Sequence, residues 1–93
     1  MDLPVRYDEL LPYEKRLVRN QYAEIQKGKC FYCGSDLSGP PSDEVAKKRV
    51  NRNLFPRTFF SYPIHLHHSH EDGMTIGAVH NYCNAVLWQY EGE

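Results

Sequence analysis

The chain has few cysteines, no long apolar run and almost no net charge. Its three cysteines are an odd number, which argues against a complete disulfide framework and fits a reducing compartment. No apolar stretch approaches bilayer-spanning length and the N-terminus carries no signal-peptide pattern, so we expect a cytoplasmic protein without a membrane partner. The formal net charge of −1 excludes nucleic-acid binding through bulk positive charge. Any such contact must therefore rest on local patches.

Histidine and cysteine, in contrast, are concentrated in two places. All five histidines and the third cysteine lie within residues 64–84, and the other two cysteines form the motif Cys30-Phe31-Tyr32-Cys33. A chain of 93 residues makes one domain with a limited core, and such domains often need a staple. The sequence therefore offers two ligand sets, a thiolate-rich set for a structural metal and a histidine-rich set for chemistry.

The thiolate-rich set has the spacing of a structural zinc site. Cys30 and Cys33 are separated by two residues, and so are His80 and Cys83. Together they form a Cys3His set, which suits tetrahedral zinc and closes all four coordination positions. A redox role for C-x-x-C needs a βαβ context, which is absent. The alternative is that Cys30 and Cys33 are small buried hydrophobic residues and that His80 caps the last helix.

The second set combines four histidines within six positions with an asparagine directly after the last cysteine: His65, His67, His68, His70 and Asn84. Cleavage of a phosphodiester needs a base and a cation on the phosphate, and histidine suits the base because its pKa lies near neutrality. Strict alternation along a strand would send His67 and His68 to opposite faces. Both reach one phosphate only if a bulge or a strand end breaks the alternation. The asparagine amide oxygen is a fair but weak Mg²⁺ ligand.

Hydrophobic periodicity predicts an α+β order of elements. An amphipathic helix begins at Pro12 and ends at Gly28, and we expect its apolar stripe to pack on the rest of the domain. The stripe consists of Leu11, Val18, Tyr22 and Ile25, and the opposite side carries Lys15, Arg19 and Gln26. We expect a short helix over 42–49, extended segments over 58–62 and 64–68, a turn at 71–73, a strand over 74–79 and a helix over 81–90. The apolar bulk of this last helix comes from Ala85, Val86, Leu87 and Trp88.

Two segments resemble motifs of the HNH endonucleases, also called His-Me finger or ββα-metal nucleases. They are His65-Leu66-His67-His68-Ser69-His70 and His80-Asn81-Tyr82-Cys83-Asn84. The likeness is greater to the phage recombination endonuclease VII-like subfamily, in which a C-x-x-C precedes an H-x-D-H-x-H strand and a second zinc pair running directly into a catalytic asparagine. It covers roughly residues 30–90. The resemblance implies a small single α+β domain. An N-terminal helical arm over 1–29 packs on a ββα-metal core over 30–93, a β-hairpin plus a helix stapled by the Cys3His zinc.

Carried over by position, the resemblance implies a metal-dependent DNA endonuclease. His68 is then the general base that activates water, and His67 and Asn84 hold the catalytic divalent cation. His65 and His70 contact or orient the phosphate. The cation that the resemblance implies is Mg²⁺. Because His67 stands where the subfamily often has aspartate, the site is one negative charge poorer, which also favours Mn²⁺, Ni²⁺ or Zn²⁺.

The implied partner is DNA, whether duplex, nicked or branched, and a phage-encoded enzyme would act in the host cytoplasm. His80 replaces a zinc-binding cysteine of the subfamily. Nothing beyond the N-terminal helix corresponds to the helices through which junction-resolving enzymes dimerise, so a monomer and a homodimer both stay open. Two basic clusters are candidate phosphate contacts, although either one alone is better interpreted as a solvated face. They consist of Lys15, Arg16 and Arg19, and of Lys47, Lys48, Arg49, Arg52 and Arg57.

Two other functions are compatible with the sequence. A non-catalytic zinc module that binds nucleic acid or protein would suit the near-neutral charge and the seven tyrosines and four phenylalanines. Such a module does not need the histidine cluster. A zinc hydrolase acting on a different substrate would need an open three-ligand zinc site with an acidic base. Glu71 and Asp72 do not supply that base, because they belong to a predicted turn.

Overall fold

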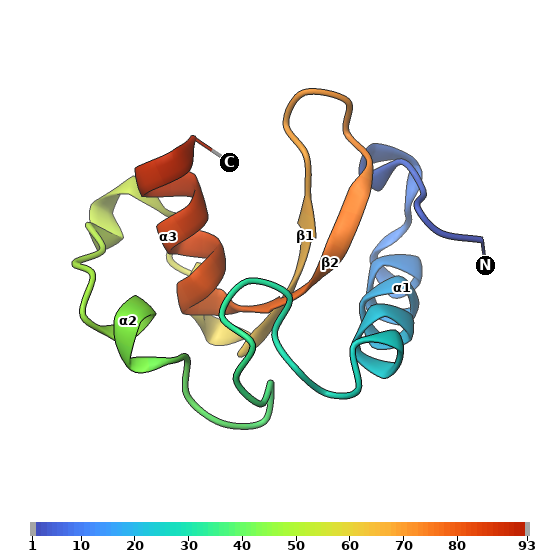
Figure 1. Ribbon diagram of the computed structural model, residues 1–93. Helices are drawn as coiled ribbons and strands as arrows, with labels where there is room; N and C mark the ends of the chain where they lie inside the picture. The colour runs from blue at the N-terminus through green and yellow to red at the C-terminus, as the bar shows by residue number, and fades with distance from the viewer. Residues whose placement is uncertain (1, 93) are drawn as a thin grey trace.

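A β-hairpin stands at the centre of the molecule, with α-helices on both sides of it (Figure 1). The computed structural model describes residues 2–92. Strands β1 (Ile64–His68) and β2 (Thr75–His80) pair antiparallel, and α3 (Asn81–Glu91) begins directly after β2. The C-terminal part of the chain therefore has the predicted order of strand, strand and helix.

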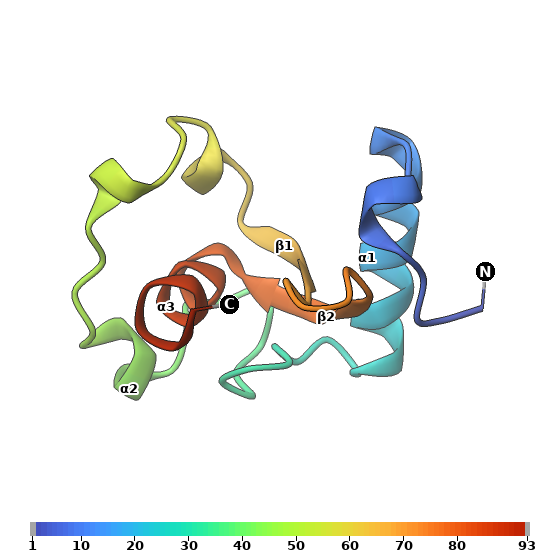
Figure 2. The same ribbon diagram turned by 90° about the horizontal axis from the view of Figure 1, so that it is seen from above.

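The other elements precede the hairpin in the chain. Helix α1 (Pro12–Ile25) lies on the side of the hairpin opposite to α3, and the one-turn helix α2 (Asp43–Ala46) packs beside α3 (Figure 1, Figure 2). Single 3₁₀ turns are η1 (Tyr7–Glu9), η2 (Arg52–Leu54) and η3 (Phe59–Ser61). The Cα radius of gyration is 12.6 Å, close to the value of about 12 Å expected for a compact domain of this length.

These elements confirm a small, compact α+β domain. The division into an arm over 1–29 and a core over 30–93 stays a prediction. Among residues 2–92, no helix combines the length and the apolar character needed to cross a membrane.

Helix α1 begins at Pro12 as predicted, but the predicted apolar stripe is only half right. Val18 and Tyr22 are buried, whereas Leu11 and Ile25 are 55% and 64% exposed. Only the middle of the stripe is therefore buried. The side predicted to face solvent instead supplies Gln26, whose side chain donates to the carbonyl of Ala78 and accepts from its N–H, each at 2.9 Å. Gln26 thus joins the end of α1 to the backbone of β2.

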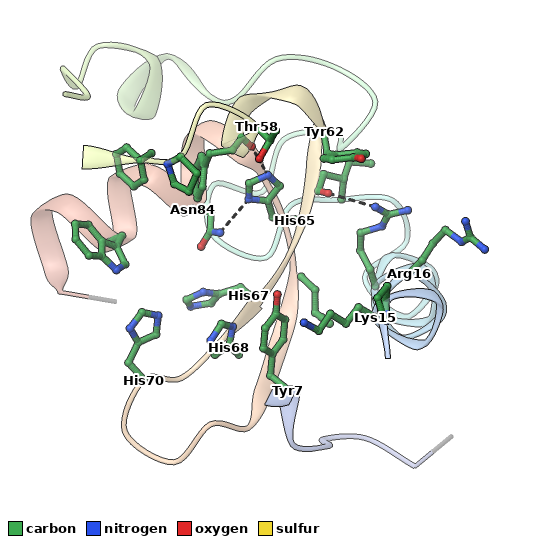
Figure 3. A pocket seen from close by; sticks show the side chains of 18 of the residues that line it. Tyr7, Lys15, Arg16, Thr58, Tyr62, His65, His67, His68, His70 and Asn84 are labelled. Carbon is green, nitrogen blue, oxygen red and sulfur yellow. Dashed lines mark hydrogen bonds between the residues drawn. The ribbon is translucent and has the colours of Figure 1, made fainter. Parts of the chain in front are cut away.

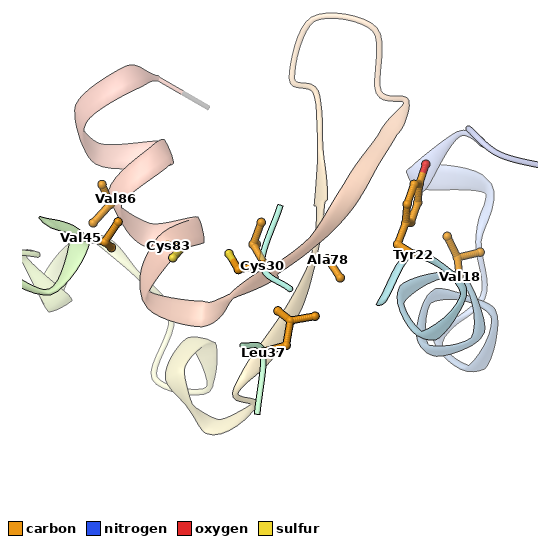
Figure 4. Close-up of a cluster of buried hydrophobic side chains, with 9 residues drawn as sticks. Val18, Tyr22, Cys30, Leu37, Val45, Ala78, Cys83 and Val86 are labelled. Atoms are coloured by element: carbon orange, nitrogen blue, oxygen red, sulfur yellow. The ribbon is translucent and has the colours of Figure 1, made fainter. Parts of the chain in front are cut away.

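The buried core continues from one side of the hairpin to the other (Figure 4). On the α1 side, Val18 and Tyr22 pack toward Ala78. On the α3 side, the buried residues are Cys30, Leu37, Val45, Cys83 and Val86. Two of the four predicted zinc ligands, Cys30 and Cys83, are therefore core residues, and a metal there would connect the turn after α1 to the start of α3 (Figure 4).

The segment over 58–62 is not extended, and that prediction is wrong. It contains η3, in which the N–H of Phe59 donates to the carbonyl of Pro56 at 3.0 Å. A high β-propensity reflects side-chain packing on a sheet surface. Here Phe59 and Phe60 pack instead against Phe55, with ring centroids 4.6 and 5.9 Å apart. An aromatic cluster thus takes the place of the predicted strand.

Candidate functional site

The four predicted zinc ligands converge where the turn after α1 meets the start of α3. The ligand atoms of Cys30, Cys33, His80 and Cys83 all lie within 4.8 Å of one another. Nδ1 of His80 lies 3.5 Å from Sγ of Cys33 and 3.5 Å from Sγ of Cys83. In a tetrahedral zinc site with ordinary bond lengths, a sulfur and a nitrogen ligand are about 3.6 Å apart. The cluster can therefore hold a zinc ion.

Hydrogen bonds around the cluster orient its ligands. Nε2 of His80 donates to the backbone carbonyl of Asp36 at 2.8 Å, which leaves the Nδ1 lone pair for the metal. His80 is the N-cap residue of α3, as the alternative expected, but its side chain makes no capping hydrogen bond. Gly34 has a positive φ of 79°, which closes the turn around Cys30 through a 3.0 Å hydrogen bond to its carbonyl.

The charges in this cluster also favour a cation. A hydrogen bond from Cys83 lowers the pKa of the Cys30 thiol, and the same hydrogen bond, together with burial, raises the pKa of Cys83. The hydrogen bond thus stabilises the thiolate of Cys30 and disfavours that of Cys83. Three thiolates this close together need a positive charge among them, which a zinc ion supplies.

The hairpin has the irregularity that the histidine cluster requires. His67 pairs with Gly77, and His68 pairs with Thr75, so the register shifts between the two histidines. Regular alternation would turn these neighbours to opposite faces of the hairpin. His67 and His68, on either side of this shift, both line one cavity. Two imidazoles that are adjacent in sequence are therefore available to one site.

Asn84 reaches the same cavity from the first turn of α3 and is held by His65 (Figure 3). Nε2 of His65 faces the carbonyl of Phe59 at 2.8 Å, so this nitrogen carries the proton. Burial lowers the pKa of His65, which keeps the ring neutral and leaves Nδ1 as an acceptor. Nδ1 accepts from Nδ2 of Asn84 at 3.0 Å. The amide oxygen of Asn84 is consequently the atom turned away from His65.

His68 lies in a stack of side chains that the sequence did not predict. The ring of Tyr7 lies parallel to it, with centroids 3.8 Å apart, and His70 lies on it at 5.1 Å. Nζ of Lys15 lies 4.2 Å from the centroid of the Tyr7 ring. Tyr7 is positioned because its N–H donates to the carbonyl of Gly73 at 2.9 Å, which ties the N-terminal segment to the hairpin turn. No local pattern around Tyr7 signals this long-range contact.

These residues share a cavity of about 970 Å³ (Figure 3). One wall is α1, the other is formed by α3 and the aromatic segment over 54–62, and β1 lies between them. All five predicted catalytic residues line the cavity: His65, His67, His68, His70 and Asn84. His67 is the most enclosed of the histidines outside the zinc cluster, at 3% exposure.

The cavity is positively charged although the chain as a whole is not. Lys15, Arg16 and Arg19 line it, and none of its described lining residues is aspartate or glutamate. The guanidinium of Arg19 is partly engaged within the protein, since it donates to the carbonyl of Ile64 at 3.5 Å and to Oδ1 of Asn20 at 3.4 Å, while its buried Nε has no partner among residues 2–92. Lys15 and Arg16 are therefore the cations best placed for an anion.

The second basic cluster lies elsewhere. Its five members, Lys47, Lys48, Arg49, Arg52 and Arg57, are not among the residues that line the cavity. Two of them lie over aromatic rings instead: Lys48 over Tyr90 at 5.1 Å and Arg52 over Phe60 at 4.2 Å. Helix α2 ends at Ala46 rather than at residue 49, so the prediction that Lys47, Lys48 and Arg49 form its last turn is also wrong.

Comparison with protein-family models, with curated proteins and with solved structures gives no match for this chain.

Proposed function

We propose that this chain is a metal-dependent DNA endonuclease of the HNH type. The observation that most supports the proposal is that His67 and His68, which flank the register shift in the hairpin, line the same cavity as Asn84. Phosphodiester hydrolysis needs a base, ligands for a cation and positive charge for the phosphate. The cavity contains residues suited to each of these tasks.

His68 acts as the general base in this proposal. Burial lowers its pKa, and the nearby His70 and His67 lower it further, so the ring is neutral near pH 7 and accepts a proton from water. The stacked ring of Tyr7 restricts the orientation of His68. The water oxygen then forms the new bond to phosphorus, the bond from phosphorus to the 3′ oxygen breaks, and solvent protonates that oxygen. The products are a 5′-phosphate and a 3′-hydroxyl.

His67 and Asn84 would hold the divalent cation, which when bound neutralises charge on the phosphate and on the leaving oxygen. The donors are an imidazole and an amide oxygen, and no carboxylate lies among the described residues of the cavity. Such a set fits Mn²⁺ or Ni²⁺ better than Mg²⁺, which prefers carboxylate oxygens. His65 uses both ring nitrogens within the protein, so we assign it the role of orienting Asn84 rather than of contacting phosphate.

Lys15 and Arg16 would bind the phosphates that flank the scissile bond. Both line the cavity from α1, whereas the cluster from Lys47 to Arg57 lies outside it. Contacts of this kind position a strand without reading its sequence.

Nicking of supercoiled plasmid in Mg²⁺, Mn²⁺ and Ni²⁺ tests the proposal. His68→Ala should slow nicking by about 10²- to 10⁴-fold, the usual contribution of a general base. Arg57→Ala, an exposed change outside the cavity, serves as the matched control and should keep the rate. Purified protein that binds DNA but cuts it in none of these metals would favour the non-catalytic zinc module. A His68→Ala rate equal to that of the unmodified chain would overturn the assignment of the base.

A further inference from the structure

The wall of the cavity opposite α1 is aromatic and partly open to solvent. Phe55 contacts Trp88 of α3, with ring centroids 5.6 Å apart, and also contacts Phe59. Phe59 packs edge-on against His65, 4.6 Å away, so the aromatic wall is continuous with the pair formed by His65 and Asn84. Trp88 is 43% exposed and Tyr62 is 65% exposed. Trp88, one of the apolar residues of the last helix, lines the cavity.

The facing wall of the cavity, formed by α1, is cationic. Lys15 and Arg16 of α1 line it, and the one ion pair found within residues 2–92 joins Lys29 to Asp36, so neither cation is ion-paired with a carboxylate in that part of the chain. A ligand that fills the space must therefore be flat and apolar on one side and anionic on the other. A nucleotide strand with unpaired bases has this character, because its bases stack on aromatic rings while its phosphates meet cations.

Paired DNA matches these walls less well. In a duplex the bases are stacked on one another, and a protein reaches only phosphates and groove edges. The aromatic wall would then face charged phosphates, and its rings would gain no partner. The volume of about 970 Å³ is near the upper end of the 300–1,000 Å³ usual for ligand sites, which is room for one or two nucleotides inside the cavity.

We infer that the cavity binds DNA through at least one unpaired base, which stacks on Trp88 while the neighbouring phosphates meet Lys15 and Arg16. The inference rests on the proposed nuclease function, since it names the form of DNA that the same cavity takes. The preferred substrate is then a single strand, or the single-stranded part of a flap, bulge or frayed end. The scissile phosphate of such a strand lies near His68 and Asn84.

Binding measured without cleavage tests this inference separately from the nuclease. Trp88 is the chain's one tryptophan, so its fluorescence reports stacking directly. Zinc-loaded protein without any further divalent cation is titrated with a 12-nucleotide single strand, with its duplex, and with a single strand that has abasic sites. The single strand should quench Trp88 to saturation. The duplex and the abasic strand should quench it weakly and bind at least tenfold less tightly.

Substitutions then locate the stacking surface. With a 5′-labelled single strand followed by anisotropy, Trp88→Ala should weaken binding by roughly 5- to 150-fold, the range of one lost base-stacking contact. Trp88→Phe should restore most of it. The matched control is Tyr90→Ala, because Tyr90 is an exposed aromatic residue of α3 that does not line the cavity. Zinc content and circular dichroism establish that each variant is folded.

The possible results of these binding experiments distinguish the inference about unpaired bases from the proposed nuclease activity. Equal affinity for the single strand and the duplex, or unchanged binding by folded Trp88→Ala, overturns the inference whether or not the chain cuts DNA. Quenching by the single strand from a chain that cuts no DNA in any metal supports the inference and overturns the nuclease.

Discussion

Asn84 donates its amide N–H to Nδ1 of His65 at 3.0 Å, and His65 is itself fixed by its hydrogen bond to the carbonyl of Phe59 at 2.8 Å. The second hydrogen bond determines which nitrogen of His65 carries the proton. That choice in turn determines which end of the Asn84 amide faces His65. A 3₁₀ turn remote in sequence from α3 thus controls which atom of Asn84 is available to a cation.

Removing this control should weaken the binding of the catalytic cation. In His65→Ala the amide of Asn84 loses its partner and can rotate, so we expect the Mn²⁺ concentration for half-maximal nicking to rise about 10- to 100-fold, as for other residues that orient metal ligands. The rate at saturating Mn²⁺ should fall less. His70→Ala is the control, because His70 stacks on His68 and not on Asn84, and it should leave the half-maximal concentration unchanged. An unaltered metal dependence in His65→Ala would show that Asn84 is oriented by other contacts.

The contact between Tyr7 and His68 predicts a pH effect. Burial is the largest cause that lowers the pKa of His68, followed by the charges of His70 and His67. Because the reaction needs the neutral ring, the rate should rise with pH through this lowered pKa, with a midpoint below the ordinary value of about 6.5. Tyr7→Ala exposes the ring and should move the midpoint upward toward that value, whereas Tyr7→Phe keeps the stacked ring and should not. The measurement is the pH–rate profile.

An independent titration of His68 by NMR, without added divalent cation, should show the same shift. Tyr13→Ala is the matched control, since Tyr13 also lines the cavity and is 56% exposed. Tyr13→Ala should leave the midpoint of the His68 titration unchanged. The same midpoint in Tyr7→Ala and in the unmodified chain would contradict the role of Tyr7.

Local signals in the sequence predicted much of this fold but not the contacts that assemble the cavity. Pro12 gave the start of α1, and the paired spacings of cysteine and histidine gave the metal cluster, because both depend on residues close in the chain. The stack of Tyr7 on His68 depends on the pairing of the N-terminal segment with the hairpin turn. The turn η3 formed because its phenylalanines pack on Phe55, which itself packs on Trp88, rather than on a sheet. Neither contact leaves a trace in local periodicity.

The zinc cluster should decide whether the domain folds. Zinc binding by such peptides is worth about 10–16 kcal/mol at pH 7, which matches or exceeds the whole stability of about 5–15 kcal/mol of an ordinary domain. Cys30→Ser and His80→Ala should therefore lose zinc and unfold, as measured by metal analysis and circular dichroism. His80→Cys supplies a fourth thiolate and should retain both zinc and fold. Folded, pure protein with less than half an equivalent of zinc would contradict this assignment.

Gly77 allows α1 and the zinc turn to dock on β2, so Gly77→Ala should be destabilising. A Cβ at this position would lie 2.8 Å from Oε1 of Gln26 and 3.0 Å from Cβ of Phe31. Moving Gln26 away would break its two hydrogen bonds to the backbone of Ala78. We expect a loss of about 1–3 kcal/mol in the free energy of unfolding, measured by urea denaturation of the zinc-loaded protein.

The matched control for Gly77→Ala is Gly39→Ala. A Cβ on Gly39 would meet only the carbonyl oxygen of Asp36, at an ordinary 3.8 Å. Replacing a glycine without a clash restricts the unfolded chain and typically stabilises by about 0.4–1 kcal/mol, so the two variants should differ in sign. In a Gln26→Ala background the hydrogen bonds are already absent, and Gly77→Ala should then cost less. Equal costs in both backgrounds would mean that the clash with Phe31, and not the contact with Gln26, makes glycine necessary here.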